Sequence, residues 1–103
     1  MSVRPASRRV VNAAAAFGSH LRTWRKLLRL SAEVTADRAG ISRGTLRRLE
    51  NGDPSVKLET VFRVAAALGI LETVAESADP LNSDFGRLRA FAQLPKRVRT
   101  QHG

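Results

Sequence analysis

Residues 43–50, RGTLRRLE, contain three arginines and a glycine at spacings that would let them bind one ligand together. At about 100° per helical residue, Leu46 and Leu49 share one side of this segment and would face a core. The opposite side then holds Arg43, Gly44, Arg47 and Arg48. Arginine offers paired N–H donors that fit guanine O6 and N7 in the DNA major groove, and glycine lets a helix backbone come close to base edges. The pattern predicts a base-reading helix face, with a solvated surface helix as the alternative.

Two short helices joined by a glycine turn would position this face. Ser31 is a suitable N-cap for a helix over residues 32–39, and Gly40 supplies the left-handed residue that ends it. Ser42 is a suitable N-cap for the helix over residues 43–50, and the Asn-Gly-Asp-Pro turn that follows cannot continue that helix. Helix, short turn with glycine, helix is the spacing of a helix-turn-helix motif.

Apolar residues recur at helical spacing along the rest of the chain, and no stretch shows the alternation of a strand. We therefore predict an all-α fold. Phe17, Leu21, Trp24 and Leu28 form one apolar stripe of a first helix over residues 12–29, in which Trp24 is expected to anchor the core.

Three more helices complete the predicted plan, and Pro95 is expected to end the last of them. They cover residues 55–68, 71–78 and 84–93. The chain is thus divided into a basic N-terminal arm, a helix-turn-helix DNA-binding domain and a C-terminal extension for dimer or partner contacts. Their predicted bounds are residues 1–11, 12–78 and 79–103.

Charge points to a polyanionic partner. The 103 residues carry 18 Lys plus Arg against nine Asp plus Glu, a net charge of +9, and residues 1–30 hold seven cations and no acid. An excess of this size in a small domain favours nucleic acid as the partner. We expect Arg4, Arg8 and Arg9 of the arm to contact phosphates, although solvated chain ends are often basic without a function.

The sequence favours a cytoplasmic, nucleoid-associated protein. There is no cysteine, so a disulfide framework and thiolate chemistry are excluded. The segment SRRVVNAAAAF imitates a secretion leader, but Asn12 and the cations that soon follow interrupt its apolar stretch. No window reaches the ~18 apolar residues of a membrane span, so we expect no membrane partner.

Catalysis and metal binding have little support in the sequence. Neither His20 nor His102 has a hydroxyl, a carboxylate or a second metal ligand at a spacing typical of a catalytic or metal site. Glu72 and Glu76 could grip a hard cation, but an i, i+4 acidic pair is more typical of a solvated face. We expect no enzyme, no metal and no cofactor. A basic RNA-binding protein remains the alternative on charge, although RNA modules expose stacking aromatics, and the aromatic residues here lie mostly on apolar stripes.

Residues 21–70 resemble the Xre/Cro–CI family of helix-turn-helix regulators, through DRAGISRGTLRRLENG and LETVFRVAAALGI. The resemblance implies a five-helix, lambda-repressor-like DNA-binding domain that is usually a homodimer and reads a palindromic operator in double-stranded DNA. By position, it assigns base reading to Arg43, Gly44, Thr45, Arg47 and Arg48. It assigns phosphate contacts to Ser31, Ala32, Asn51 and Lys57. The sequence departs from the family pattern at Ala32, where a phosphate-binding glutamine is common, and at Thr35, where a core leucine is common.

An internal ion pair is also expected. Glu50 follows the inward Leu49 and lies at the edge of the predicted core, where a carboxylate needs a cation. The resemblance places Arg25 at the position that pairs with this glutamate. We therefore predict an Arg25–Glu50 pair that orients the helix over residues 43–50.

The C-terminal segment DPLNSDFGRLRAFAQLPKRVR is similar to the tail of HipB-like antitoxins, which are encoded beside Hip-type kinase toxins. This similarity implies an autorepressor that also holds a kinase; a stand-alone Xre-type repressor without a toxin is the alternative. Residues 79–93 are expected to dock as a helix on the domain or on a second subunit, with residues 95–103 mobile until a partner binds. The expected contact residues are Phe85, Leu88, Phe91, Arg97 and Arg99.

Overall fold

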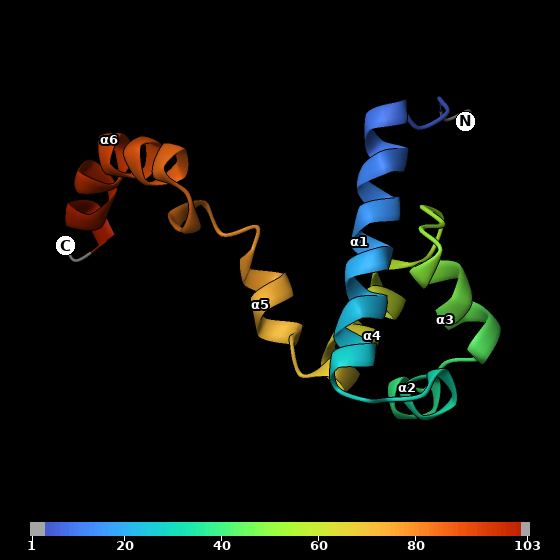
Figure 1. Ribbon diagram of the computed structural model, residues 1–103. Helices are drawn as coiled ribbons and strands as arrows, with labels where there is room; N and C mark the ends of the chain where they lie inside the picture. The colour runs from blue at the N-terminus through green and yellow to red at the C-terminus, as the bar shows by residue number, and fades with distance from the viewer. Residues whose placement is uncertain (1–3, 102–103) are drawn as a thin grey trace. The chain divides into compact units, whose positions relative to one another are not determined.

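The protein is all-helical over the residues that its computed structural model describes, which are 4–101, with side chains up to residue 93 (Figure 1). The helices are α1 (Arg8–Leu27), α2 (Ala32–Ala39), α3 (Arg43–Glu50), α4 (Leu58–Leu68), α5 (Leu71–Glu76) and α6 (Asp84–Gln101), with a short 3-10 turn at Pro80–Asn82. The predicted all-α class is confirmed. None of the described helices has the length and apolar character of a membrane-spanning segment. The chain forms two compact units, one ending at Leu71 and one beginning at Glu72.

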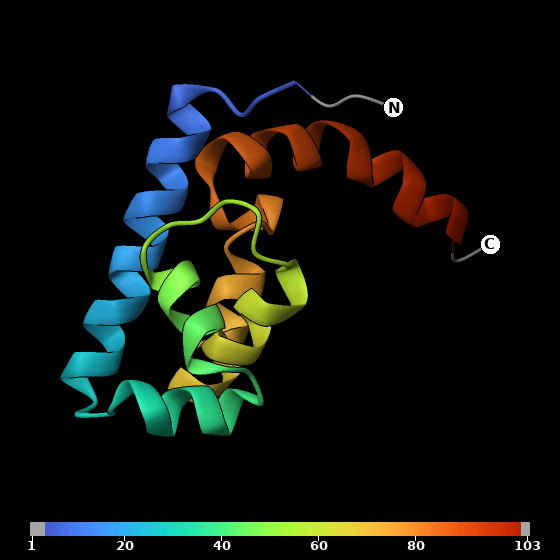
Figure 2. The same cartoon turned by 90° about the vertical axis from the view of Figure 1, so that its right-hand side faces the viewer.

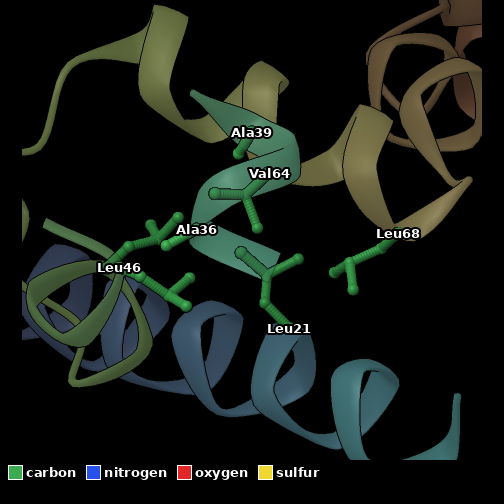
Figure 3. Packing of buried hydrophobic residues seen from close by; sticks show 7 residues of the cluster. Leu21, Ala36, Ala39, Leu46, Val64 and Leu68 are labelled. Atoms are coloured by element: carbon green, nitrogen blue, oxygen red, sulfur yellow. The ribbon is translucent and has the colours of Figure 1, made fainter. Parts of the chain in front are cut away.

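The core of the first unit lies between α1, α2, α3 and α4. Leu21, Leu46 and Val64 are almost fully buried, and the smaller side chains of Ala36 and Ala39 fill the space between them. Figure 3 shows these side chains pointing toward one another from the four helices. Burial of this apolar surface is the main source of the unit's stability.

Both helices of the predicted motif have the predicted bounds because their ends are fixed locally. The Ser31 hydroxyl accepts a hydrogen bond from the backbone N–H of Val34 at 3.0 Å, and Ser42 does the same for Thr45. Gly40 ends α2 in the left-handed conformation, at a φ of 72°. Side-chain caps of this kind satisfy backbone donors that a helix leaves free at its start.

Helix α1 begins earlier than predicted, at Arg8 rather than at residue 12, and ends at Leu27. Ser7 caps it by accepting from the backbone N–H of Val10 at 3.3 Å. Alanine-rich sequence follows, which favours the helix. Arg8 and Arg9 therefore belong to the first turn of α1, and of the predicted arm over residues 1–11 only 4–7 are described outside a helix.

The prediction that Trp24 anchors the core is wrong, because this residue is 43% exposed. Leu21 is the α1 residue that fills the centre, while Leu28 is as exposed as Trp24. Three of the buried core residues are alanines (Ala36, Ala39 and Ala65), so the interior is small and closes over leucine-sized side chains.

Two other predicted helix ends differ from the structure. Helix α4 begins at Leu58 rather than at residue 55, because the Asp53 carboxylate binds the backbone N–H of Ser55 and holds a turn there. Helix α6 continues past Pro95 to Gln101. A proline removes one backbone hydrogen bond and kinks a helix, and here the helix continues after it. Helix α5 also ends slightly early, at Glu76 rather than at 78.

The second unit is held together by the 3-10 turn and the first turns of α6. Gly86 lies directly against the backbone of Pro80, at a distance that leaves no space for a Cβ atom. Phe85, Leu88 and Phe91 are each more than two-thirds exposed, and no described residue of this unit is buried. Arg97 and Arg99 lie outside the described side chains.

Thr35 offers a direct test of the core. It is fully buried in α2, and its hydroxyl has no hydrogen-bond partner among the described residues. Because an unsatisfied buried hydroxyl is costly, Thr35→Val is expected to raise the free energy of unfolding by about 1 kcal/mol, measured by chemical denaturation. The control is Thr23→Val on the exposed side of α1, which should change it by less than about 0.5 kcal/mol. A loss of stability in Thr35→Val would show that the hydroxyl is hydrogen-bonded in solution.

Candidate nucleic-acid interface

A buried ion pair fixes α3 against α1. Arg25 donates to Glu50 twice, from Nε to Oε2 at 2.7 Å and from Nη2 to Oε1 at 3.0 Å. Its Nη1 donates to the carbonyl of Leu30 at 3.1 Å, so the same guanidinium also ties down the turn before α2. Only 5% of the Glu50 side chain and 13% of the Arg25 side chain are exposed. The paired geometry of two parallel N–H···O bonds is the strong form of an arginine–carboxylate contact.

Arg22 joins this pair, which the sequence reasoning did not foresee. Its Nε lies 3.3 Å from Glu50 Oε1, and its Nη2 donates to Asn51 Oδ1 at 2.9 Å. Burial raises the pKa of Glu50, but the hydrogen bonds and charges of Arg25 and Arg22 outweigh it and leave the pKa below its ordinary value. The i, i+3 spacing of Arg22 and Arg25 was the available signal, because it places both on one face of a helix.

Close backbone contact between α1 and α3 completes the support. Gly18 is buried at the crossing, and a Cβ atom there would collide with the backbone carbonyls of Leu49 and Glu50. Only glycine permits this approach. Helix α3 is thus held by its inner side, and its outer side is left free for contacts.

The outer side of α3 borders two hollows, and its arginines divide between them. The first, the α1–α3 hollow, has a volume of about 240 Å³. It is lined by Arg22, Arg25, Lys26, Ala32, Arg43, Leu46, Arg47 and Glu50. The ion pairs found among the described side chains leave Lys26, Arg43 and Arg47 without a carboxylate partner. This hollow is therefore a strongly cationic pocket.

The second hollow lies between α3 and the start of α4 and has a volume of about 280 Å³. It is lined by Thr45, Arg48, Ser55, Val56, Lys57 and Thr60. Its walls are mostly polar side chains and two cations. Arg48 is bonded to the neighbouring loop, through Asp53 and Ser55. We name this cavity the α3–α4 hollow.

The other sequence-predicted site residues are more scattered. The Ser31 hydroxyl caps α2, Asn51 accepts from Arg22, and Lys57 is exposed just before α4. Arg8 and Arg9 are exposed at the opposite end of α1 from α2 (Figures 1 and 2). Arg4 is exposed in the segment before α1. Lys26 is the cation of this surface that sequence reasoning missed, although it lies one residue after Arg25.

Gly44 follows Arg43, which lines the α1–α3 hollow, and precedes Thr45, which lines the α3–α4 hollow. The fold does not require a glycine at this position. Its φ is not in the left-handed region, and a Cβ atom there would meet only the Ser42 hydroxyl, at an ordinary 3.9 Å. Gly44 is the second residue of α3, and a glycine within a helix costs up to about 1 kcal/mol relative to alanine. A residue that weakens its own helix without a packing reason points to a close approach from outside.

Gly44→Ala should therefore separate stability from binding. The variant is expected to gain up to about 1 kcal/mol in the free energy of unfolding, and to lose affinity for duplex DNA. Thermal unfolding and a duplex titration measure the two effects. Gain of stability with unchanged DNA affinity would show that the nucleic acid does not approach the helix at this point.

No group of three or more potential ligand side chains that could hold a metal ion is present among the described residues.

Comparison with protein families identifies the helix-turn-helix family HTH_3, whose model matches residues 21–73, just over half of the chain. The match runs from the last two turns of α1 through α2, α3 and α4 into the start of α5. No curated protein and no solved structure matches the chain.

Proposed function

The chain belongs to the helix-turn-helix family HTH_3 and is a DNA-binding transcriptional regulator, and from this premise we propose that it is a repressor that reads a palindromic operator as a homodimer. The observation that carries the proposal is the outer side of α3. There, Arg43 and Arg47 border one hollow, Arg48 borders the other, and Gly44 is open to solvent. A helix held by its inner side, with cations on its outer side, suits the major groove.

Base reading is assigned to five residues of α3: Arg43, Gly44, Thr45, Arg47 and Arg48. Each arginine can donate to guanine O6 and N7, and Gly44 admits the base edges. The Thr45 hydroxyl accepts a hydrogen bond from the Ser42 hydroxyl at 2.9 Å. Its own proton remains available for a base or phosphate, and its methyl group can contact thymine.

Phosphate contacts are assigned to the surfaces beside α3. Lys26, which has no carboxylate partner among the described side chains, and Ala32, the first residue of α2, both line the α1–α3 hollow. Cationic charge and the positive end of a helix dipole therefore border the same hollow. The cations of this hollow take over the phosphate contact that the family commonly makes with a glutamine at the position of Ala32. The remaining contacts are assigned to Ser31, Asn51, Lys57, Arg4, Arg8 and Arg9. Such contacts orient the protein on the duplex without reading sequence.

Duplex DNA and hairpin RNA give the most direct test of this function. In gel-shift titrations at equal salt, the chain is expected to bind a specific duplex more tightly than an RNA hairpin of the same length. Preference for the hairpin would instead identify a basic RNA-binding protein.

The C-terminal unit is proposed to make the dimer or partner contacts, and the chain to be an autorepressing antitoxin of a HipBA-type pair. The support is the HipB-like tail sequence together with the exposed face of Phe85, Leu88 and Phe91 on α6. Apolar side chains at this density on one helix favour a protein partner. Arg97 and Arg99 are assigned to the same contacts, with a Hip-type kinase as the partner; a stand-alone repressor would use the face for dimers only.

Leu88→Asp in the full chain tests the tail. Leu27, which is equally exposed at 71% on α1, provides the matched control Leu27→Asp. The Leu88 variant is expected to weaken the dimer in sedimentation equilibrium, or to lose capture of a Hip-type kinase, while the control does neither. If the Leu88 variant dimerises and captures the kinase at full strength, the tail has neither role.

A further inference from the structure

Two residues of the loop after α3 accept hydrogen bonds from one side of the Arg48 guanidinium. Asp53 Oδ2 accepts from Arg48 Nε at 2.8 Å, and the Ser55 hydroxyl accepts from Arg48 Nη2 at 3.2 Å. Ser55 is itself fixed, because its hydroxyl and its backbone N–H both donate to Asp53 Oδ1, at 2.6 Å and 2.9 Å. Arg48, Asp53 and Ser55 are thus each hydrogen-bonded to the other two, at an exposed place on the domain surface.

These bonds use one particular edge of the guanidinium. An arginine has a side edge, made by Nε–H and one N–H of Nη2, and an end edge, made by one N–H each of Nη1 and Nη2. Asp53 and Ser55 occupy the two donors of the side edge. The end edge remains available, and two parallel N–H groups there match O6 and N7 of one guanine.

We propose that Asp53 is a positioning residue that holds the side edge of Arg48, so that only the end edge is presented to DNA and Arg48 reads guanine selectively. This inference rests on the proposed function, in which Arg48 reads a base. Without the bond to Asp53, the Arg48 side chain could rotate toward phosphates, which carry no sequence information. Asp53 thus converts a flexible cation into a base-specific contact.

The charge of Asp53 supports positioning rather than affinity. Hydrogen bonds from Ser55 and Arg48 lower the pKa of Asp53 to about 2, so the carboxylate is ionised at every pH used for DNA binding. A negative charge beside a DNA-binding helix repels phosphates and weakens general affinity. An exposed ion pair also adds little to folding stability. Asp53 also holds the turn before α4 through the backbone N–H of Ser55, but its Oδ1 does this, and the bond from its Oδ2 to Arg48 is not needed for it. For the Arg48 bond, a gain in discrimination is the benefit that remains.

Asp53→Asn in the full chain tests the proposal. This substitution keeps the size of the side chain, but it removes the negative charge and replaces one of the two acceptor oxygens by an NH2 donor. Affinities are measured for the operator, for an unrelated duplex, and for operators changed at the one base pair where Arg48→Ala loses discrimination. Asp53→Asn is expected to reduce discrimination at that pair about tenfold, while affinity for the unrelated duplex holds or rises.

Glu33→Gln is the matched control, because Glu33 is an exposed carboxylate in the first turn of α2. It removes the same charge without touching Arg48, and should shift all affinities together and leave discrimination unchanged. Ser55→Ala should give an intermediate loss, since Asp53 would still hold Nε. In the free protein, the ¹⁵N resonance of Arg48 Nε should show slower proton exchange in the parent chain than in Asp53→Asn.

Two results would overturn the inference while leaving the proposed function intact. Unchanged discrimination in Asp53→Asn would show that the bond to Asp53 does not select the reading edge. Improved discrimination would show that Asp53 competes with DNA for Arg48. A parent chain that discriminates no sequence at all would instead contradict both the inference and the function on which it rests.

Discussion

Glu50→Ala is expected to lower the free energy of unfolding by ~3–5 kcal/mol. The carboxylate is nearly inaccessible to solvent and is bonded to Arg25 and Arg22. Its removal leaves the Arg25 guanidinium, which is 13% exposed, without a counter-charge. Loss of one partner of a buried pair is costly because the other charge stays desolvated. Chemical denaturation at pH 7 measures the loss.

Arg22→Ala is the control for this prediction, because Arg22 is 42% exposed and should cost ~1 kcal/mol or less. The pH dependence has a fixed sign. Since the folded-state pKa of Glu50 is below its ordinary value, its stabilisation is present above the unfolded pKa and is lost as the pH falls through the folded pKa. A loss under ~1 kcal/mol in Glu50→Ala would show that solvent reaches the pair.

Arg43→Ala has the second largest expected effect, a loss of about 1–3 kcal/mol of operator binding for each half-site. Arg43 borders the cationic α1–α3 hollow without a carboxylate partner among the described side chains, so its guanidinium is free to meet a base. The loss should fall mainly on the operator and relax preference at one base pair per half-site. Titrations against the operator, its single-base variants and an unrelated duplex measure this.

Arg9→Ala is the matched comparison, because Arg9 is an exposed arginine in the first turn of α1. It should weaken binding to all duplexes equally and reduce the slope of log K against log salt by ~0.9. Equal losses on every duplex in Arg43→Ala would make Arg43 a phosphate contact instead of a base reader.

Local signals made part of the fold predictable. Ser31, Gly40 and Ser42 fix the ends of α2 and α3 through bonds to their own neighbourhood, and so the sequence predicts these helices with the bounds observed. Glu50 could be recognised from its place beside an inward leucine, and the structure contains its pair with Arg25.

Other features depend on contacts between distant segments. Whether Trp24 is buried depends on the space left by α2, α3 and α4, and that space holds only smaller side chains. Arg22 and Lys26 acquire their places when α1 crosses α3. The bond between Arg48 and Asp53 requires a turn that brings the loop back along α3. Periodicity within one helix carries no information about these contacts.

The central claim is that the outer side of α3 reads DNA sequence, and binding-site selection from a random duplex library tests it most directly. The full chain, selected at physiological salt, is expected to enrich a palindrome with guanine at the positions that lose preference in Arg43→Ala and Arg48→Ala. An unenriched library would contradict the claim, and so would an enriched motif that both variants select unchanged.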